Sequence, residues 1–126
     1  MPKNVAELFR YLDATLEETV KGELLSLPED TLYEMHFGLN AFIRSVAFYK
    51  NESETGKAYF SNLGDPDSAS GVLGEMYWAH LHRRPMTQEF VTNSVDRHWI
   101  FFMSDAERDL TCLELINDYK DLSIHG

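Results

Sequence analysis

The sequence predicts an all-α fold, a compact bundle of six or seven helices, and three observations lead to this prediction. Apolar residues recur at steps of three and four along most of the 126-residue chain, which is the spacing of one helical face. Signals that start helices precede these segments. The single run rich in aromatic and β-branched residues, near 97–103, has no second strand to pair with, so we interpret it as helix rather than as a buried strand. The length is ordinary for one domain, and we expect residues 1–126 to share one core.

Two short helices are expected in the first quarter of the chain. Asn4 and Glu7 have the spacing of a capping box and are followed by a helical apolar pattern. A second helix is expected to begin near Asp13 or Thr15. The turn at 26–30 then restarts the chain, because Pro28 suits a first helical turn and the residues around it have the spacing of another capping box.

The longest helical pattern predicts a central helix at about residues 29–50. Its apolar stripe consists of Leu32, Met35, Leu39, Phe42, Val46 and Tyr49. His36 and Arg44 lie eight positions apart, and therefore on nearly the same face. We interpret them as a polar core that bonds to carbonyls or carboxylates of neighbouring helices. The alternative is an anion site or an acid and base pair, but no nucleophile accompanies them, so no catalytic residue is assigned.

The second half of the chain predicts the remaining helices. A two-turn segment ends near Gly64, and Asp65 with Pro66 and Asp67 then forms a strong helix start. That helix should end near residues 83–85, because the residue before a proline is steered out of the helical region. Thr87 is expected to open the next helix. Ser104 is expected to cap the last one.

Charge is the most informative part of the composition. The chain holds 11 basic and 21 acidic residues, and the excess of acid lies at its two ends, in residues 1–34 and 104–126. Such a surface disfavours nucleic acid and anionic membrane as partners and speeds encounter with a basic protein. Solubility alone is the alternative explanation. The candidate partner-binding acidic surface consists of Glu17, Glu18, Glu23, Asp105, Glu107 and Asp109.

No cofactor or metal site is expected. His80 and His82 diverge by roughly 200° on a helix and cannot share a metal there. Arg83 and Arg84 beside them read as a solvated helix end, with contact to a phosphate or RNA as the alternative. Cys112 is expected to be buried and inert, which is consistent with a cytoplasmic localisation. No apolar run reaches the roughly 18 residues of a membrane helix.

Two segments resemble a family of small bacterial domains of unknown function. The first is MHFGLNAFIRS and the second, about 20 residues later, is DPDSASGVLGEMYWAHL. The matching positions are His36, Gly38, Ile43, Arg44, Asp67, Ser68 or Ser70, Tyr77, Trp78 and Leu81. The sequence departs from the pattern at Phe42 and Ser45, where the family has tryptophan and asparagine. The resemblance covers roughly residues 15–85.

Similar domains are found among immunity proteins of bacterial toxin systems, and the resemblance therefore implies toxin neutralisation. We expect a non-enzymatic protein that binds a cognate toxin with a basic surface and occludes it through the acidic surface. The alternative is an adaptor or regulatory protein that acts as a homo-oligomer. An enzyme built on His36 and Arg44 is a third hypothesis.

Overall fold

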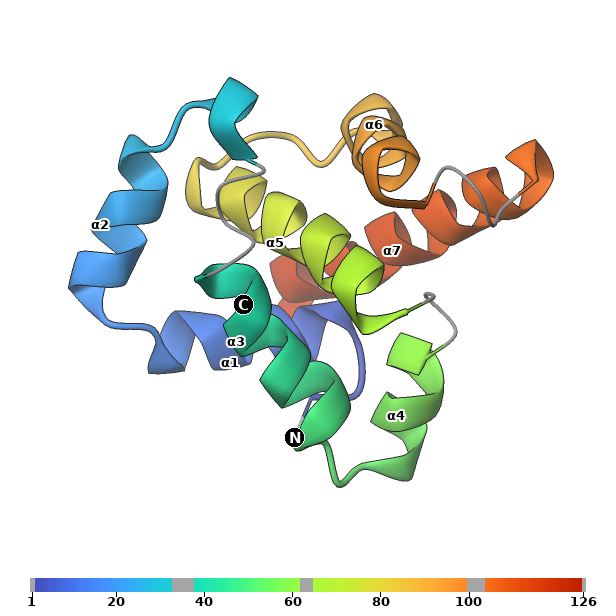
Figure 1. The fold of residues 1–126 in the computed structure, drawn as a ribbon, viewed down its shortest axis with the longest axis horizontal. Helices are drawn as coiled ribbons and strands as arrows, with labels where there is room; N and C mark the ends of the chain where they lie inside the picture. Colours follow the sequence, from blue (N-terminus) through green and yellow to red (C-terminus); the bar gives the residue numbers. More distant parts are fainter. Residues whose placement is uncertain (1, 33–37, 62–64, 100–103, 126) are drawn as a thin grey trace.

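The computed structural model describes residues 2–32, 38–61, 65–99 and 104–125, with backbone alone for Lys57, Ser61, Trp99 and residues 121–125. Within these ranges the chain forms seven α-helices and no strand, which confirms the predicted all-α bundle (Figure 1). The helices are α1 (Val5–Thr15), α2 (Glu18–Ser26), α3 (Leu39–Arg44), α4 (Glu54–Ser61), α5 (Pro66–Leu81), α6 (Gln88–Trp99) and α7 (Asp105–His125). A π-helical turn, η2 (Ser45–Tyr49), follows α3 directly.

Local side chains start several helices as the sequence predicts. The Asn4 side chain accepts a hydrogen bond from the Glu7 amide at 3.0 Å, and that of Asp65 accepts from the Ser68 amide at 2.9 Å. Ser104 caps α7 in the same way. Each bond satisfies an amide that the first helical turn leaves without a backbone partner.

The predicted capping box at residues 26–29 is wrong. Ser26 is the last residue of α2, and its hydroxyl donates to the Gly22 carbonyl at 3.0 Å instead of starting a new helix. Residues 29–32, the last described residues before the gap at 33–37, have 3₁₀ geometry.

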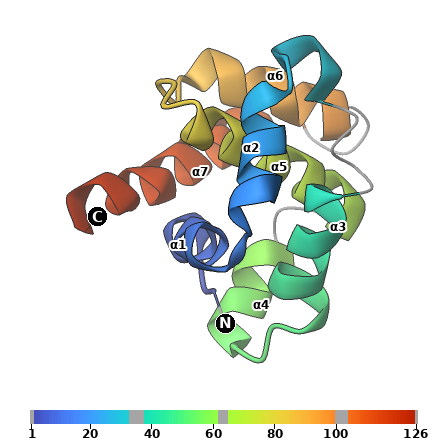
Figure 2. The same cartoon turned by 90° about the vertical axis from the view of Figure 1, so that its left-hand side faces the viewer.

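The centre of the bundle is α5 and not the predicted helix at 29–50. All residues from 69 to 79 are buried, and α5 packs against α2, α3 and α6 (Figures 1 and 2). The described part of the expected central helix is shorter and lies at the edge, since α3 and η2 together span 39–49 and Tyr49 is 69% exposed. Its stripe is therefore one flank of the core.

Small residues explain why α5 takes the central position. A side chain at Gly71 would collide with the His98 ring of α6, and one at Gly74 would collide with the Asn40 side chain of α3. Neighbouring helices thus approach α5 closely on two sides. A helix enclosed in this way shows no single apolar stripe. Its central position in the bundle therefore cannot be recognised from the helical periodicity of its sequence.

The last two helices complete the same core. Val91, Val95, Cys112, Leu115 and Ile116 are buried together with the inner face of α1. Residues 97–99 are helical, in line with the interpretation of this run, whereas 100–103 lie outside the described residues. In the described part of the chain, no helix combines the length and the apolarity needed to cross a bilayer.

Candidate functional site

The predicted polar core is represented in the structure by Arg44. Its side chain is 15% exposed and joins the end of α3 to the first turn of α5, with Nη1 donating to Ser70 Oγ at 3.3 Å and Nε lying 3.4 Å from Asp67 Oδ1. Arg44, Asp67 and Ser70 therefore meet at one helix junction. His36, the other member of the predicted pair, lies outside the described residues.

The structure separates the predicted acidic surface into two parts. Glu17, Glu18 and Glu23 are exposed at α2, whereas Asp105, Glu107 and Asp109 belong to the start of α7, at the opposite end of the long axis of the molecule (Figure 1). The α7 acids are partly neutralised, because Arg108 lies within 3.7 Å of Asp105 and 3.4 Å of Asp109. Within the described part of the chain, the α2 acids have one such contact, a 3.7 Å pair between Glu18 and Lys21.

An open groove of about 480 Å³ runs between α2 and α3. We call it the α2–α3 groove, and its lining consists of Leu16, Val20, Glu23, Leu24, Leu27, Gly38, Leu39 and Phe42. Of these described residues, six have apolar side chains and Glu23 is the one ionisable group. Glu17 and Glu18 stand beside it at the first turn of α2, so an apolar floor has an acidic margin.

Two aromatic residues of the family pattern act as clamps. The Tyr77 hydroxyl donates to Asp13 Oδ1 of α1 at 2.9 Å, and Trp78 Nε1 donates to the Leu27 carbonyl after α2 at 2.8 Å. Burial, followed by the hydrogen bond to Asp13, raises the pKa of Tyr77, so its hydroxyl remains a donor. Both residues fasten α5 to the N-terminal helices.

Asp13 also anchors a second network. His80 Nε2 lies 3.0 Å from Asp13 Oδ2, and His80 Nδ1 lies 3.0 Å from the Tyr119 hydroxyl of α7. A carboxylate only accepts, so Nε2 is the donor to Asp13, and the tautomer with its proton on Nε2 can accept the Tyr119 proton at Nδ1. Burial, with a smaller effect of the Asp13 charge, raises the pKa of Tyr119 and keeps that proton in place. The network is suited to fixing ring positions rather than to generating a nucleophile.

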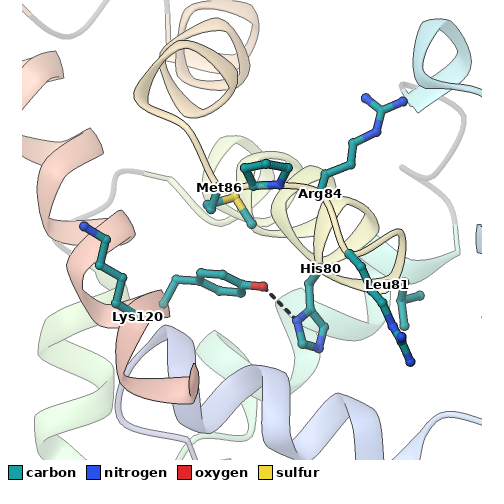
Figure 3. A pocket seen from close by; sticks show the side chains of 8 residues that line it. His80, Leu81, Arg84, Met86 and Lys120 are labelled. Carbon is teal, nitrogen blue, oxygen red and sulfur yellow. Dashed lines mark hydrogen bonds between the residues drawn. The ribbon is translucent and has the colours of Figure 1, made fainter. Parts of the chain in front are cut away.

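A pocket of about 720 Å³ lies beside this network, between the carboxyl end of α5 and α7 (Figure 3). We call it the basic pocket, and it is lined by His80, Leu81, Arg83, Arg84, Pro85, Met86, Tyr119 and Lys120. His80 and Lys120 stand on opposite sides of it, on different helices (Figure 3). The sequence pointed to the arginines, but Tyr119 and Lys120 lie 35 and more positions further on, and no local pattern joins them to His80.

Arg84, at the same end of α5, already has interaction partners. Arg84 Nη1 donates to Glu29 at 2.7 Å, and its guanidinium lies 4.6 Å from the ring centre of Trp78. His82 lies close to the same indole, with ring centres 4.2 Å apart, and its Nε2 is 3.3 Å from the Leu24 carbonyl. His80 and His82 thus point to different partners, as the helical geometry predicts.

A buried carboxylate was not anticipated from the sequence. Glu75 is 2% exposed, and its two oxygens contact Arg97 and His98 of α6. Burial opposes the charged form, but hydrogen bonds from His98 and Arg97 outweigh it and lower the pKa of Glu75. Its partners are 22 and 23 positions away, beyond any helical spacing.

Cys112 and the metal-ligating residue types offer no further site. Cys112 is fully buried, as expected, and burial raises the pKa of its thiol, which makes it unreactive. Across the residues that the structure describes, no three histidine, cysteine, aspartate or glutamate side chains come together in a way that would hold a metal ion.

Comparison with known proteins identifies a family. The model of a family described as a domain of unknown function, DUF6794, matches residues 1–81, which takes in α1 to α5. No curated protein and no solved structure matches the chain.

Proposed function

The chain belongs to the DUF6794 family of domains of unknown function, and from its geometry we propose that it is a non-enzymatic protein-binding module. The α2–α3 groove is the proposed docking site, and its occupant is a basic, amphipathic helix of a partner protein. The observation that carries this proposal is the apolar groove with an acidic margin.

The groove has the chemistry that such a helix requires. Its apolar floor, including Val20, Leu24 and Phe42, would receive side chains spaced at one face of the helix. Glu17, Glu18 and Glu23 would meet lysines or arginines flanking that face, and in a chain of net charge -10 they would also steer encounter. Because Glu23 is the one ionisable group among the described residues of the lining, we assign the groove to binding rather than to catalysis.

A pair of synthetic peptides tests the groove directly. One is a leucine and lysine amphipathic helix of about 18 residues, or five turns, and the other has glutamate in place of each lysine. Fluorescence anisotropy measures the binding of each peptide to the protein. We expect saturable binding of the lysine peptide and no binding of the glutamate peptide. Glu17→Lys with Glu23→Lys should weaken it by about tenfold or more.

Two control variants locate the interaction. Glu52→Lys changes an exposed residue after η2, and Glu107→Lys changes one on α7. Both should bind the peptide nearly as well as the natural chain. If only Glu107→Lys lowers the affinity for the peptide, the docking site lies on α7. If all variants lower the affinity equally, the effect is due to net charge.

The finer form of the proposal identifies the partner as a protein toxin and the chain as its immunity protein, acting in the cytoplasm. The bacterial family resemblance and the acidic charge support it. When the chain is co-expressed with a toxin encoded in the neighbouring gene, it should rescue growth. The double variant Glu17→Lys with Glu23→Lys should not rescue growth. Rescue by that variant would separate neutralisation from the groove.

A second candidate is a homo-oligomeric adaptor, which one observation favours. Leu110 and Leu113 on α7 are 62% and 45% exposed, and they lie three positions apart on the outer face of that helix. Light scattering of the natural chain and of Leu110→Glu decides between them. A dimer that the variant dissociates supports self-association, and a monomer at all concentrations excludes it.

A further inference from the structure

We propose that the basic pocket binds a small organic anion, one with a carboxylate or phosphate group on an apolar body. The proposal goes beyond protein binding, and it uses none of the residues of the α2–α3 groove.

Two cations of the pocket are available to a ligand. Within the described residues, Arg83 and Lys120 form no ion pair, whereas Arg84 is held by Glu29. They stand on different elements, one after α5 and one on α7, and both contribute to the lining of the pocket. Such a concentration of positive charge is unusual in a chain with 21 acidic residues. The same acidity disfavours a long polyanion such as nucleic acid.

The backbone at the end of α5 supports this assignment. Arg83 has φ 55°, the left-handed conformation in which glycine is favoured at this position of a helix end. The Arg83 and Arg84 amides donate to the carbonyls of His80 and Ala79 at 3.1 and 3.0 Å. These bonds satisfy two carbonyls of the last turn, and the arginine charges at this end complement the negative pole of the helix dipole. An arginine is therefore placed, at a backbone cost, where glycine would serve the fold better.

The rest of the lining defines the body of the ligand. Leu81, Pro85 and Met86 give the pocket an apolar wall, and the volume of about 720 Å³ lies in the range of sites for small organic molecules. The hydrogen bond from Tyr119 to His80 fixes the position of the phenol ring. The pocket is thus largely formed in advance, which reduces the entropy lost on binding. An inorganic ion would leave the apolar wall without a contact.

Titration by two-dimensional NMR tests the assignment with defined probes. Phenyl phosphate and phenylacetate represent the two anionic groups, benzyl alcohol is the neutral analogue, and inorganic phosphate lacks the apolar body. We expect saturable shifts at the amides of residues 80–86 and 119–120 with at least one aromatic anion. Benzyl alcohol and inorganic phosphate should give at least about tenfold weaker effects, because each lacks one of the two contacts.

Variants decide whether the pocket cations are responsible. Arg83→Gly removes the guanidinium while easing the backbone, and Lys120→Gln removes an exposed charge, so both should fold. Each variant should lower the affinity for the aromatic anion by about fivefold, as expected for the loss of one partly exposed charge contact. Lys50→Gln carries the same change of charge outside the pocket and should leave binding unaltered.

Several results would overturn the proposal. These are the absence of saturable shifts with both aromatic anions, equal binding of benzyl alcohol or inorganic phosphate, and equal weakening by Lys50→Gln. Because no residue of the α2–α3 groove is changed, failure here is distinct from failure of the peptide experiment.

Discussion

The Asn40 side chain of α3 lies directly over Gly74 of α5, at the point where the two helices cross. Asn40 is 3% exposed, and its Oδ1 makes no hydrogen bond among the described residues. The closeness of the crossing therefore rests on the missing side chain at Gly74. Its consequence is testable because another helical glycine, Gly22, has open space around it.

Gly74→Ala should lower the free energy of unfolding by about 1 to 3 kcal/mol, because the added methyl group collides with buried Asn40. Gly22→Ala should raise it by about 0.5 to 1 kcal/mol, since alanine is the better helix former and nothing obstructs it. Urea denaturation measures both. Asn40→Ala should restore most of the loss in the Gly74→Ala background, and a failure to do so would place the strain elsewhere.

Glu75 should make stability dependent on pH in the acid range. Its pKa is lowered in the folded chain, so its contribution is fully present above its ordinary value of 4.5 and is lost as pH falls through the folded value. Glu75→Gln should cost about 1 to 3 kcal/mol at pH 7, and the difference from the natural chain should shrink in acid. Urea midpoints from pH 7 down to pH 3 test this. Parallel profiles of the two proteins would contradict it.

Arg83→Gly should stabilise the chain by about 1 kcal/mol, because glycine adopts the left-handed conformation without steric cost. Arg83→Ala is the matched control, since it removes the same guanidinium but retains a Cβ in that conformation. It should leave the urea midpoint nearly unchanged. Equal stabilisation by both changes would assign the effect to charge instead of backbone.

Asp13 and Tyr77 should be energetically coupled. Tyr77→Phe removes a donor and should cost about 1 kcal/mol, whereas Asp13→Ala leaves both Tyr77 and His80 without their acceptor and should cost about 1 to 3 kcal/mol. The double variant should cost less than the two separate losses together, by about 0.5 kcal/mol or more. Strict additivity would show that the hydrogen bond contributes nothing measurable.

Local chemistry made much of the fold predictable. Helix class, the starts at Asn4, Asp65 and Ser104, and the burial of Cys112 all depend on neighbours within a few positions. The position of the centre was not predictable in this way. The sequence of 32–50 shows a clear apolar stripe, whereas that of α5 does not. Glycines and serines interrupt the apolar pattern of α5, although the helix is buried on all sides between residues 69 and 79.

The candidate sites show a similar division. Arg44 was identified as a polar core residue because it stands among apolar side chains of one helix, but its partners Asp67 and Ser70 come from another. The basic pocket joins an arginine noticed in the sequence to Lys120, which only the packing of α7 brings near. The acidic residues were recognised by composition, and composition does not reveal that Arg108 partly neutralises one of the two sets.

The buried contact of Glu75 with Arg97 and His98 also determines the register between α5 and α6. Sliding α6 by one helical turn, about 5.4 Å, would remove both donors and leave a carboxylate without partners in an apolar interior. An interface of alanines, valines and glycines alone tolerates several such offsets. The carboxylate disfavours the displaced arrangements, so together with the close approach of His98 to Gly71 it favours one alignment of the two helices.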